Sequence, residues 1–144
     1  MKLSTRGRYG IRLLIDLAEH RSEGLVTLAS IAERQQISMR YLEQVAIILR
    51  RAGLIRSVKG ASGGYALAQE PEDIVVGDAL RRLEGDMLIM DPPLAGKIET
   101  KLERTVRRVV FDEINRHIAE IIDRETLASL VGTIDSGESY MYFI

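Results

Sequence analysis

The residues of this 144-residue chain best suited to chemistry lie between positions 38 and 51 and carry hydrogen-bond donors and acceptors. Arg40 and Gln44 can donate to the edges of purine bases, and Glu43 can accept from the amino group of cytosine. Arg50 and Arg51 suit phosphate groups, which position a protein on DNA without specifying sequence. These residue types at helical spacing predict a helix that enters the major groove of DNA.

Three helices are predicted in the first 52 residues. The first follows an N-cap at Ser4 or Thr5, and the second, which is short, follows Thr27. The third, over residues 39–52, follows Ser38 and has its apolar residues on one face at i, i+3, i+4 and i+7, namely Leu42, Val45, Ala46 and Leu49. That apolar face would pack on the first two helices and leave the polar face outward.

A glycine-rich hairpin is predicted after the third helix. Residues 54–58 and 65–68 are short strand-like runs, and the loop between them holds three glycines. Arg56 and Lys59 suit phosphate contacts, and glycines allow backbone to approach DNA closely. Two helices, a tight turn, a longer helix and a hairpin follow the order of a winged helix-turn-helix. An ordinary helical hairpin with a solvated polar face is the alternative interpretation.

Charge is divided unevenly along the chain, although the net charge is only −1. Residues 1–65 carry 11 Lys and Arg against 5 Asp and Glu, and residues 66–144 carry 9 against 16. A basic first half beside an acidic second half indicates that only the first half faces a polyanion. The chain has no cysteine, no apolar run of membrane-spanning length and no signal-peptide core at its start, so a cytoplasmic protein is expected.

The longest periodic segment runs from residue 97 to about residue 123. A helix of that length would span about 40 Å, more than a small winged domain can cover. We therefore expect it to pair with the same helix of a second copy, which also supplies the twofold symmetry that a palindromic operator needs. Its apolar stripe, the predicted dimerisation surface, consists of Ile98, Leu102, Val106, Val109, Ile114, Ile118 and Ile121.

Catalysis is not expected. Residues 60–64 match the G-x-S-x-G pattern of a hydrolase nucleophile, and Asp112 and His117 follow in hydrolase order. That pattern works between a strand and a helix, whereas this loop lies between two short strands. His20 and His117 are interpreted as surface or packing residues, because two lone histidines without cysteines make a poor metal site. No metal ligand and no cofactor is therefore predicted.

Several motifs together resemble the Rrf2 family of bacterial winged-helix regulators. They are residues 1–10 (MKLSTRGRYG), 37–44 (ISMRYLEQ), 52–55 (AGLI), 58–65 (VKGASGGY), 76–78 (VGD) and 83–85 (LEG), and the resemblance covers essentially the whole chain. It implies a homodimer that binds double-stranded DNA through the third helix, with the wing near the minor groove. The DNA-binding residues predicted overall are Lys2, Ser38, Arg40, Tyr41, Glu43, Gln44, Arg50, Arg51, Lys59, Gly60, Ser62, Gly63, Gly64 and Tyr65.

The chain departs from the family in the region between its short helix and its long helix. Members that bind an iron–sulfur cluster carry three cysteines there, and residues 86–101 of this chain contain none. The resemblance is therefore greatest to the cluster-free CymR-type subgroup, which represses genes of cysteine metabolism. The carboxylates and methionines at 86–91 are not expected to hold a cluster.

The C-terminal residues Tyr142, Phe143 and Ile144 resemble the aromatic tail of the same subgroup. There the regulator forms a complex with cysteine synthase, so the resemblance implies that the terminal carboxylate docks in a synthase-like site. The alternative is that the tail folds back on the dimer core.

The expected protein is mainly α-helical with a small β-wing. Residues 1–75 form a winged helix-turn-helix domain, and residues 76–144 form a short helix, a linker loop, a long dimerisation helix and the tail. A repressor of sulfur and cysteine metabolism genes is the favoured function. Two alternatives remain: an interaction module that regulates an enzyme through its tail, and a small-molecule sensor with its site between residues 78–96 and the long helix.

Overall fold

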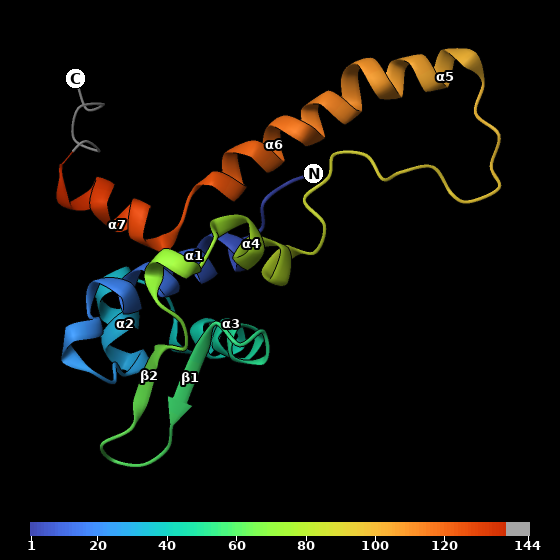
Figure 1. The fold of residues 1–144 in the computed structure, drawn as a ribbon. Helices are drawn as coiled ribbons and strands as arrows, with labels where there is room; N and C mark the ends of the chain where they lie inside the picture. Colours follow the sequence, from blue (N-terminus) through green and yellow to red (C-terminus); the bar gives the residue numbers. More distant parts are fainter. Residues whose placement is uncertain (138–144) are drawn as a thin grey trace.

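The computed structural model describes residues 1–137, which form helices and one two-stranded sheet (Figure 1). The α-helices are α1 (Thr5–Glu19), α2 (Leu28–Gln35), α3 (Met39–Arg51), α4 (Val76–Glu84), α5 (Lys101–Val106), α6 (Asp112–Arg124) and α7 (Leu127–Asp135). The strands are β1 (Ile55–Val58) and β2 (Gly64–Leu67). Short 3₁₀ turns cover Arg21–Glu23 and Pro71–Asp73, and Arg107–Phe111 is a π-helical segment. The predicted tail residues lie outside the described residues.

Side-chain caps set the starts of α2 and α3 as predicted. The Thr27 and Ser38 hydroxyls accept from the backbone N–H groups of Ser30 and Tyr41, both at 3.2 Å. Between the two helices the chain turns at Gln36, whose φ of 55° is left-handed. This tight turn orients α3 relative to α2.

The start of α1 is capped by a side chain distant in sequence. Ser4 occupies the N-cap position but makes no side-chain cap bond. Its backbone N–H and that of Gly7 instead donate to Oε1 of Glu84 at the end of α4, at 3.0 and 2.9 Å. The close approach of Glu84 also explains the glycine at position 7, because a Cβ there would lie 2.4 Å from Glu84 Oε1. This contact fixes α4 against the start of α1.

One hydrophobic core joins α1, α2, α3, the root of the wing and α4. Leu13, Ile31, Leu42 and Leu49 are fully buried in it. The row of apolar residues predicted to face inward from α3 is buried as expected. Leu83 of α4 belongs to the same core. The helix after the wing therefore packs on the first three helices.

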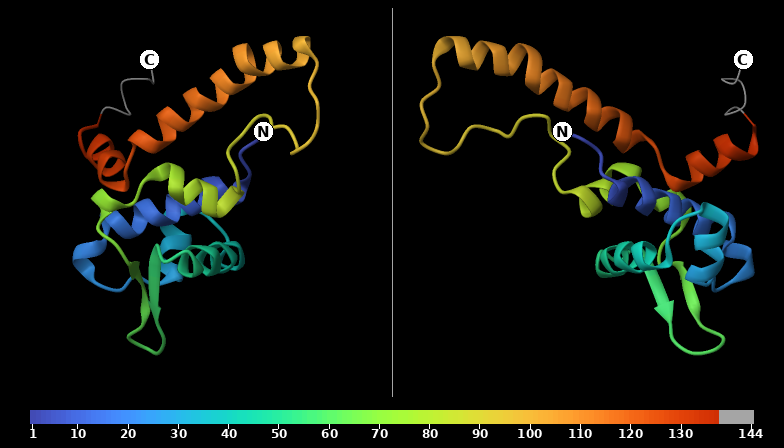
Figure 2. Two further views of the ribbon diagram at one scale, coloured as in Figure 1. Left: turned by 45° about the vertical axis from the view of Figure 1, so that its right-hand side comes forward. Right: turned by 180° about the vertical axis from the view of Figure 1, so that it is seen from behind.

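The long helix is continuous from α5 through the π-helical segment to the end of α6 (Figures 1 and 2). It begins at Lys101, four residues later than the sequence indicated, because Thr100 and Glu103 form a capping box. The one step of five in the predicted apolar stripe, from Val109 to Ile114, crosses the π-helical residues. A π turn contains one residue more than an α turn, so Val109 and Ile114 stay on the same side of the long helix.

The two ends of the molecule are distinct. The wing extends from one end, and the long helix lies at the other, with α1 and α4 between them (Figure 1). An ion pair fastens the long helix to α4, since the Arg81 guanidinium donates to both Asp123 carboxylate oxygens at 2.8 and 2.9 Å. The N-terminal part of the long helix and the preceding loop project beyond the domain (Figure 2). The predicted fold class, mainly α with a β-wing and a long helix, is confirmed.

Candidate nucleic-acid interface

The outward face of α3 presents the side chains predicted to read bases. Arg40, Glu43 and Gln44 are exposed, while the adjacent Leu42 and Val45 are buried. The burial of one face leaves the opposite face free to enter a groove, and the first two turns of the helix carry all three polar groups. The arrangement suits donors and an acceptor directed at base edges.

Two of the predicted residues are engaged inside the protein. The Ser38 hydroxyl caps α3. The Tyr41 hydroxyl is 2.7 Å from Thr5 Oγ1, and its ring meets the Tyr9 ring edge-on with centroids 5.2 Å apart. Tyr41 thus ties α3 to the start of α1, and only part of its surface remains outward.

The basic residues predicted at the start of the chain and at the end of α3 are exposed. Lys2 precedes α1, and Arg50 and Arg51 end α3. Arg50 donates to the Ser57 hydroxyl of β1 at 3.5 Å, which directs it toward the wing. Arg6, which was not among the predicted residues, is also exposed and lines a hollow with Gln44 between α1 and α3. Only the packing of α1 against α3 identifies Arg6.

The wing combines an exposed tip with internally constrained glycines. Lys59, Gly60 and Ser62 are exposed. A Cβ on Gly63 would lie 2.0 Å from the Val58 carbonyl oxygen, and one on Gly64 would lie 2.8 Å from the Val26 carbonyl oxygen. Gly63 is therefore required by the hairpin itself and Gly64 by the contact of the hairpin with Val26, reasons the sequence did not supply.

The root of the wing is anchored beyond its own two strands. The antiparallel pairing runs from Ile55 opposite Leu67 to Val58 opposite Gly64. Tyr65 also exchanges backbone hydrogen bonds with Val26, at 2.8 and 2.7 Å. The predicted wing residue Tyr65 thus carries a structural contact that holds the hairpin at a fixed angle to α3.

A buried ion pair that the sequence did not reveal fixes α1 against α2. Asp16 is fully buried, and its carboxylate accepts from Arg34 at 2.7 and 3.0 Å and from Gln35 at 2.9 Å. Burial alone would raise the pKa of Asp16, but these hydrogen bonds hold it below its ordinary value. Asp16 interrupts an otherwise apolar helix face, and this interruption is the feature of the sequence that could have indicated a buried ion pair.

The predicted dimerisation stripe divides into an inward and an outward part. Ile118 packs beside a small cluster of Val76, Leu80 and Met87. In contrast, Ile98, Leu102 and Val109 are 91%, 73% and 66% exposed. Ile98, predicted as part of the helical stripe, lies in the loop before Lys101. The described residues thus leave apolar side chains uncovered on the projecting part of the long helix and on the loop before it.

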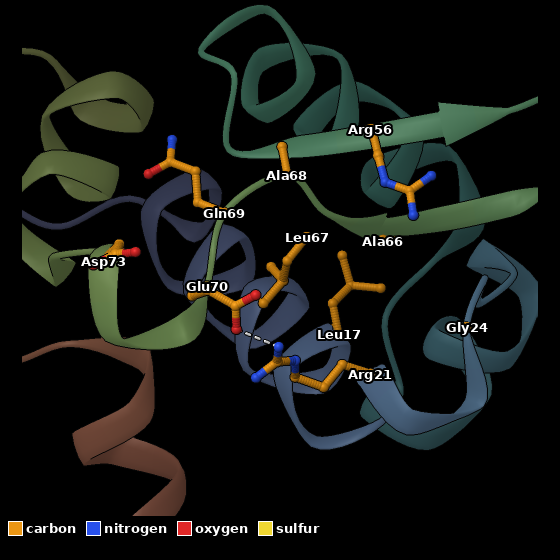
Figure 3. Close-up of a pocket in the computed structure, with 10 residues that line it drawn as sticks. All are labelled: Leu17, Arg21, Gly24, Arg56, Ala66, Leu67, Ala68, Gln69, Glu70 and Asp73. Atoms are coloured by element: carbon orange, nitrogen blue, oxygen red, sulfur yellow. Dashed lines mark hydrogen bonds and ion pairs between the residues drawn. The ribbon is translucent and has the colours of Figure 1, made fainter.

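The hollows of the described surface are shallow. One of about 460 Å³ lies at the root of the wing and is lined by Arg56 and by an ion pair between Arg21 and Glu70 (Figure 3). Another of about 380 Å³ lies between loop residues such as Leu94 and the helix residue Phe111. This second hollow lies between residues 78–96 and the long helix, where the alternative small-molecule site is predicted.

The residues between α4 and α5 do not fit an iron–sulfur cluster. Such clusters are held mainly by cysteine thiolates, and the chain has none. Met87 is buried in the packing cluster beside α4, and residues 1–137 contain no group of three or more His, Asp or Glu side chains that could hold a metal ion. No step of the function is therefore assigned to a cluster.

Together the three-helix core, the outward α3 and the hairpin define a winged helix-turn-helix protein with a long helix. A family model described as "Rrf2: Iron-dependent Transcriptional regulator" matches residues 3–133. The chain belongs to the Rrf2 family of transcriptional regulators, which confirms the resemblance seen in the sequence.

Individual relatives agree with this assignment. The HTH-type transcriptional regulator CymR of Bacillus subtilis (strain 168) is 39% identical over 145 residues, covering 100% of both chains. A solved structure of CymR, described as the global cysteine regulator of B. subtilis, has a TM-score of 0.78 at 39% identity and covers 92% of this chain and 97% of that one. The structure of T. potens IscR has a TM-score of 0.76 at 42% identity, and the match covers 99% of this chain and 97% of that one.

No helix in the described part of the chain is long and apolar enough to cross a membrane.

Proposed function

We propose that the protein binds operator DNA as a homodimer and represses transcription. The observation that carries this proposal is the outward face of α3, where Arg40, Glu43 and Gln44 stand exposed on a helix whose other face is buried in the core. Lys59 adds exposed positive charge at the wing tip, and Lys2 before α1 is exposed as well, although the start of the chain lies toward the long helix (Figure 1). In the proposed complex α3 enters the major groove and the basic residues contact phosphates.

The exposed stripe of the long helix supports the dimer. Two large apolar side chains of this helix, Leu102 and Val109, are mostly exposed, and so is Ile98 in the loop just before it. Contiguous apolar surface of this kind marks an interaction site. Pairing with the same stripe of a second copy would cover it and would present two α3 helices to the two halves of a palindrome.

Binding and footprinting with purified full-length protein test the DNA-binding proposal. At low salt we expect a protected palindromic site. Arg40→Ala and Glu43→Gln should each change the preferred base at one position, by about 1–3 kcal/mol in discrimination. Arg124→Ala removes an exposed arginine from the far end of the long helix and serves as the matched control. Absence of any protected sequence, together with unchanged behaviour of both α3 variants, would refute DNA recognition by this helix.

We further propose that the genes repressed belong to sulfur and cysteine metabolism and that regulation uses no iron–sulfur cluster. The similarity to CymR over the full length of both chains supports the first part. The absence of cysteine supports the second. Operator binding should therefore be equal for protein purified with and without oxygen, and the bound promoters, identified by immunoprecipitation from cells, should include sulfur-assimilation genes.

We also propose that Tyr142, Phe143 and Ile144 dock in cysteine synthase through the terminal carboxylate. This part rests on the sequence of the tail alone. Deletion of the last four residues should abolish heat release on titration with cysteine synthase while leaving operator binding intact. Unchanged synthase binding by the shortened protein would show that the tail is not the docking element.

A further inference from the structure

The outward side of α3 carries two large apolar side chains that the packing of the domain does not use. Met39 and Ile47 are 40% and 42% exposed. Neither is among the residues packed against the two buried clusters of the protein, whereas the neighbouring Ile48 is. A single exposed apolar residue is ordinary on a protein surface. Two exposed apolar residues on a helix whose other exposed residues are mainly polar or charged are less ordinary. The DNA groove that this helix is proposed to enter offers an explanation.

The two apolar side chains lie in one row with the proposed cytosine reader. Met39, Glu43 and Ile47 are spaced four residues apart, so they follow one another along the same side of the helix. Each step advances about 6 Å along the helix axis, against a rise of about 3.4 Å per base pair. The apolar contacts of a helix lying along the groove would therefore fall one or two base pairs on either side of the pair that Glu43 reads.

The major groove offers one apolar group that such side chains can contact, the C5 methyl of thymine. A carboxylate at the centre of the row can accept from the amino group of cytosine, and methionine and isoleucine at its ends can contact thymine methyls. We infer that Met39 and Ile47 recognise two thymines, one on each side of the base pair contacted by Glu43. This inference rests on the proposed DNA-binding function and adds to it the specificity of two flanking positions.

Removing single methyl groups from DNA tests the inference. The purified full-length protein selects its preferred duplex from a random pool, and each thymine of one half-site is then replaced by deoxyuridine, which lacks only the methyl. We expect two replacements to raise the Kd about fourfold each, the factor that corresponds to about 0.8 kcal/mol for one buried carbon. The Glu43→Gln variant locates the central base pair, because this variant should prefer a different base at one position, and that position should lie between the two thymines.

Variants assign each methyl to its side chain. With Ile47→Ala one of the two replacements should no longer affect the Kd, and with Met39→Ala the other should not. Both side chains are exposed and alanine favours helix, so both variants should fold. Ile134→Ala is the matched control, because Ile134 is also 42% exposed but lies on α7, and it should keep full sensitivity to both replacements.

The outcomes separate this inference from the proposal beneath it. Sequence-selective binding that is insensitive to every methyl, or equally sensitive in all variants, would overturn the inference and leave DNA recognition intact. If Met39 and Ile47 instead contact a protein partner, the protein should still bind its operator but should not respond to the loss of any methyl, and this result would likewise overturn the inference. Failure to select any sequence at all would instead refute the proposed function.

Discussion

At the scale of single residues, contacts between residues distant in sequence determine the geometry of the end that we propose to face DNA. Glu84 replaces the expected Ser4 side chain as the cap of α1. Burial alone would raise the pKa of this carboxyl, but hydrogen bonds from Ser4 and from the Gly7 N–H hold it below the ordinary 4.5. A carboxylate with a lowered pKa in the folded state stabilises the protein above the pKa of the unfolded chain, and that contribution disappears as the pH falls through the folded value.

Glu84→Gln should therefore lower the free energy of unfolding at pH 7 by about 1–2 kcal/mol, since a charged cap of two backbone N–H groups is replaced by a neutral amide. Denaturant unfolding at pH 7 and at pH 3 measures the effect. The difference between wild type and variant should shrink at the lower pH, because the stabilisation by the carboxylate declines once the pH is below the pKa of the unfolded chain. An equal difference at both pH values would contradict the role of the charge.

Gly63→Ala tests the internal requirement of the wing. The new Cβ would meet the Val58 carbonyl oxygen at 2.0 Å, so the hairpin must open or shift. We expect at least a tenfold loss of operator affinity with the melting temperature of the helical core little changed, measured by anisotropy and circular dichroism. Ala61→Gly, at the exposed tip of the same loop, is the control, and it should retain most of the affinity. Full affinity in Gly63→Ala would mean that the wing does not contribute to binding.

At the scale of elements, the long helix is defined by two features that depend on local sequence. Its start is set by the capping box of Thr100 and Glu103. Its apolar stripe continues past a step of five because the π-helical residues rotate the following turns. Arg107 stabilises this region by pairing with Glu99 of the loop and with Asp112, at 2.7–2.9 Å. The projecting half of the helix thus has an ordered shape before any partner is present.

Leu102→Glu and Val109→Glu should shift the protein from dimer to monomer. Both side chains are mostly exposed, so the charge costs little in the folded monomer and is unfavourable only when the stripe is covered. Analytical ultracentrifugation should show the dissociation constant raised at least a hundredfold, with unchanged helix content. Lys101→Glu, at the start of the same helix, controls for added negative charge, and a monomeric wild type would refute the dimer.

At the scale of the whole molecule, charge and shape follow the same division. The basic first half of the sequence forms the first three helices and most of the wing, and the long helix lies at the other end of the molecule (Figure 1). The acidic excess of the second half lies mainly in residues 66–100, with 8 Asp and Glu against 3 Lys and Arg, whereas the long helix, residues 101–124, is nearly neutral, with 5 against 6. Electrostatic attraction to DNA then orients the molecule with the basic α3 and wing toward the duplex and the long helix away from it. The near-zero net charge conceals a strongly polarised protein.

The salt dependence of operator binding measures this polarisation. Each phosphate contact adds about 0.9 to the slope of log K against log salt. Lys59→Ala in both subunits should reduce the slope by about 2 and weaken binding to specific and to random DNA equally, whereas Arg124→Ala at the end of the long helix should leave the slope unchanged. A Lys59 variant that alters base preference would show that the wing reads sequence as well as phosphate.

The sequence alone determined the elements and the class of protein. Helix caps at Thr27 and Ser38, the apolar face of α3 and the glycines of the hairpin are local signals, because each depends on neighbours within a few residues. The boundaries of the long helix were less accurate, since its apolar period continues through Ile98 without a helical backbone there. The tertiary structure decided the rest: the cap from Glu84, the buried pair of Asp16 and Arg34, the inward position of Tyr41 and the exposure of Met39 and Ile47. Each depends on which residues far apart in the chain come together, and hydrophobic packing of α1, α3 and α4 settles that only once the whole core forms.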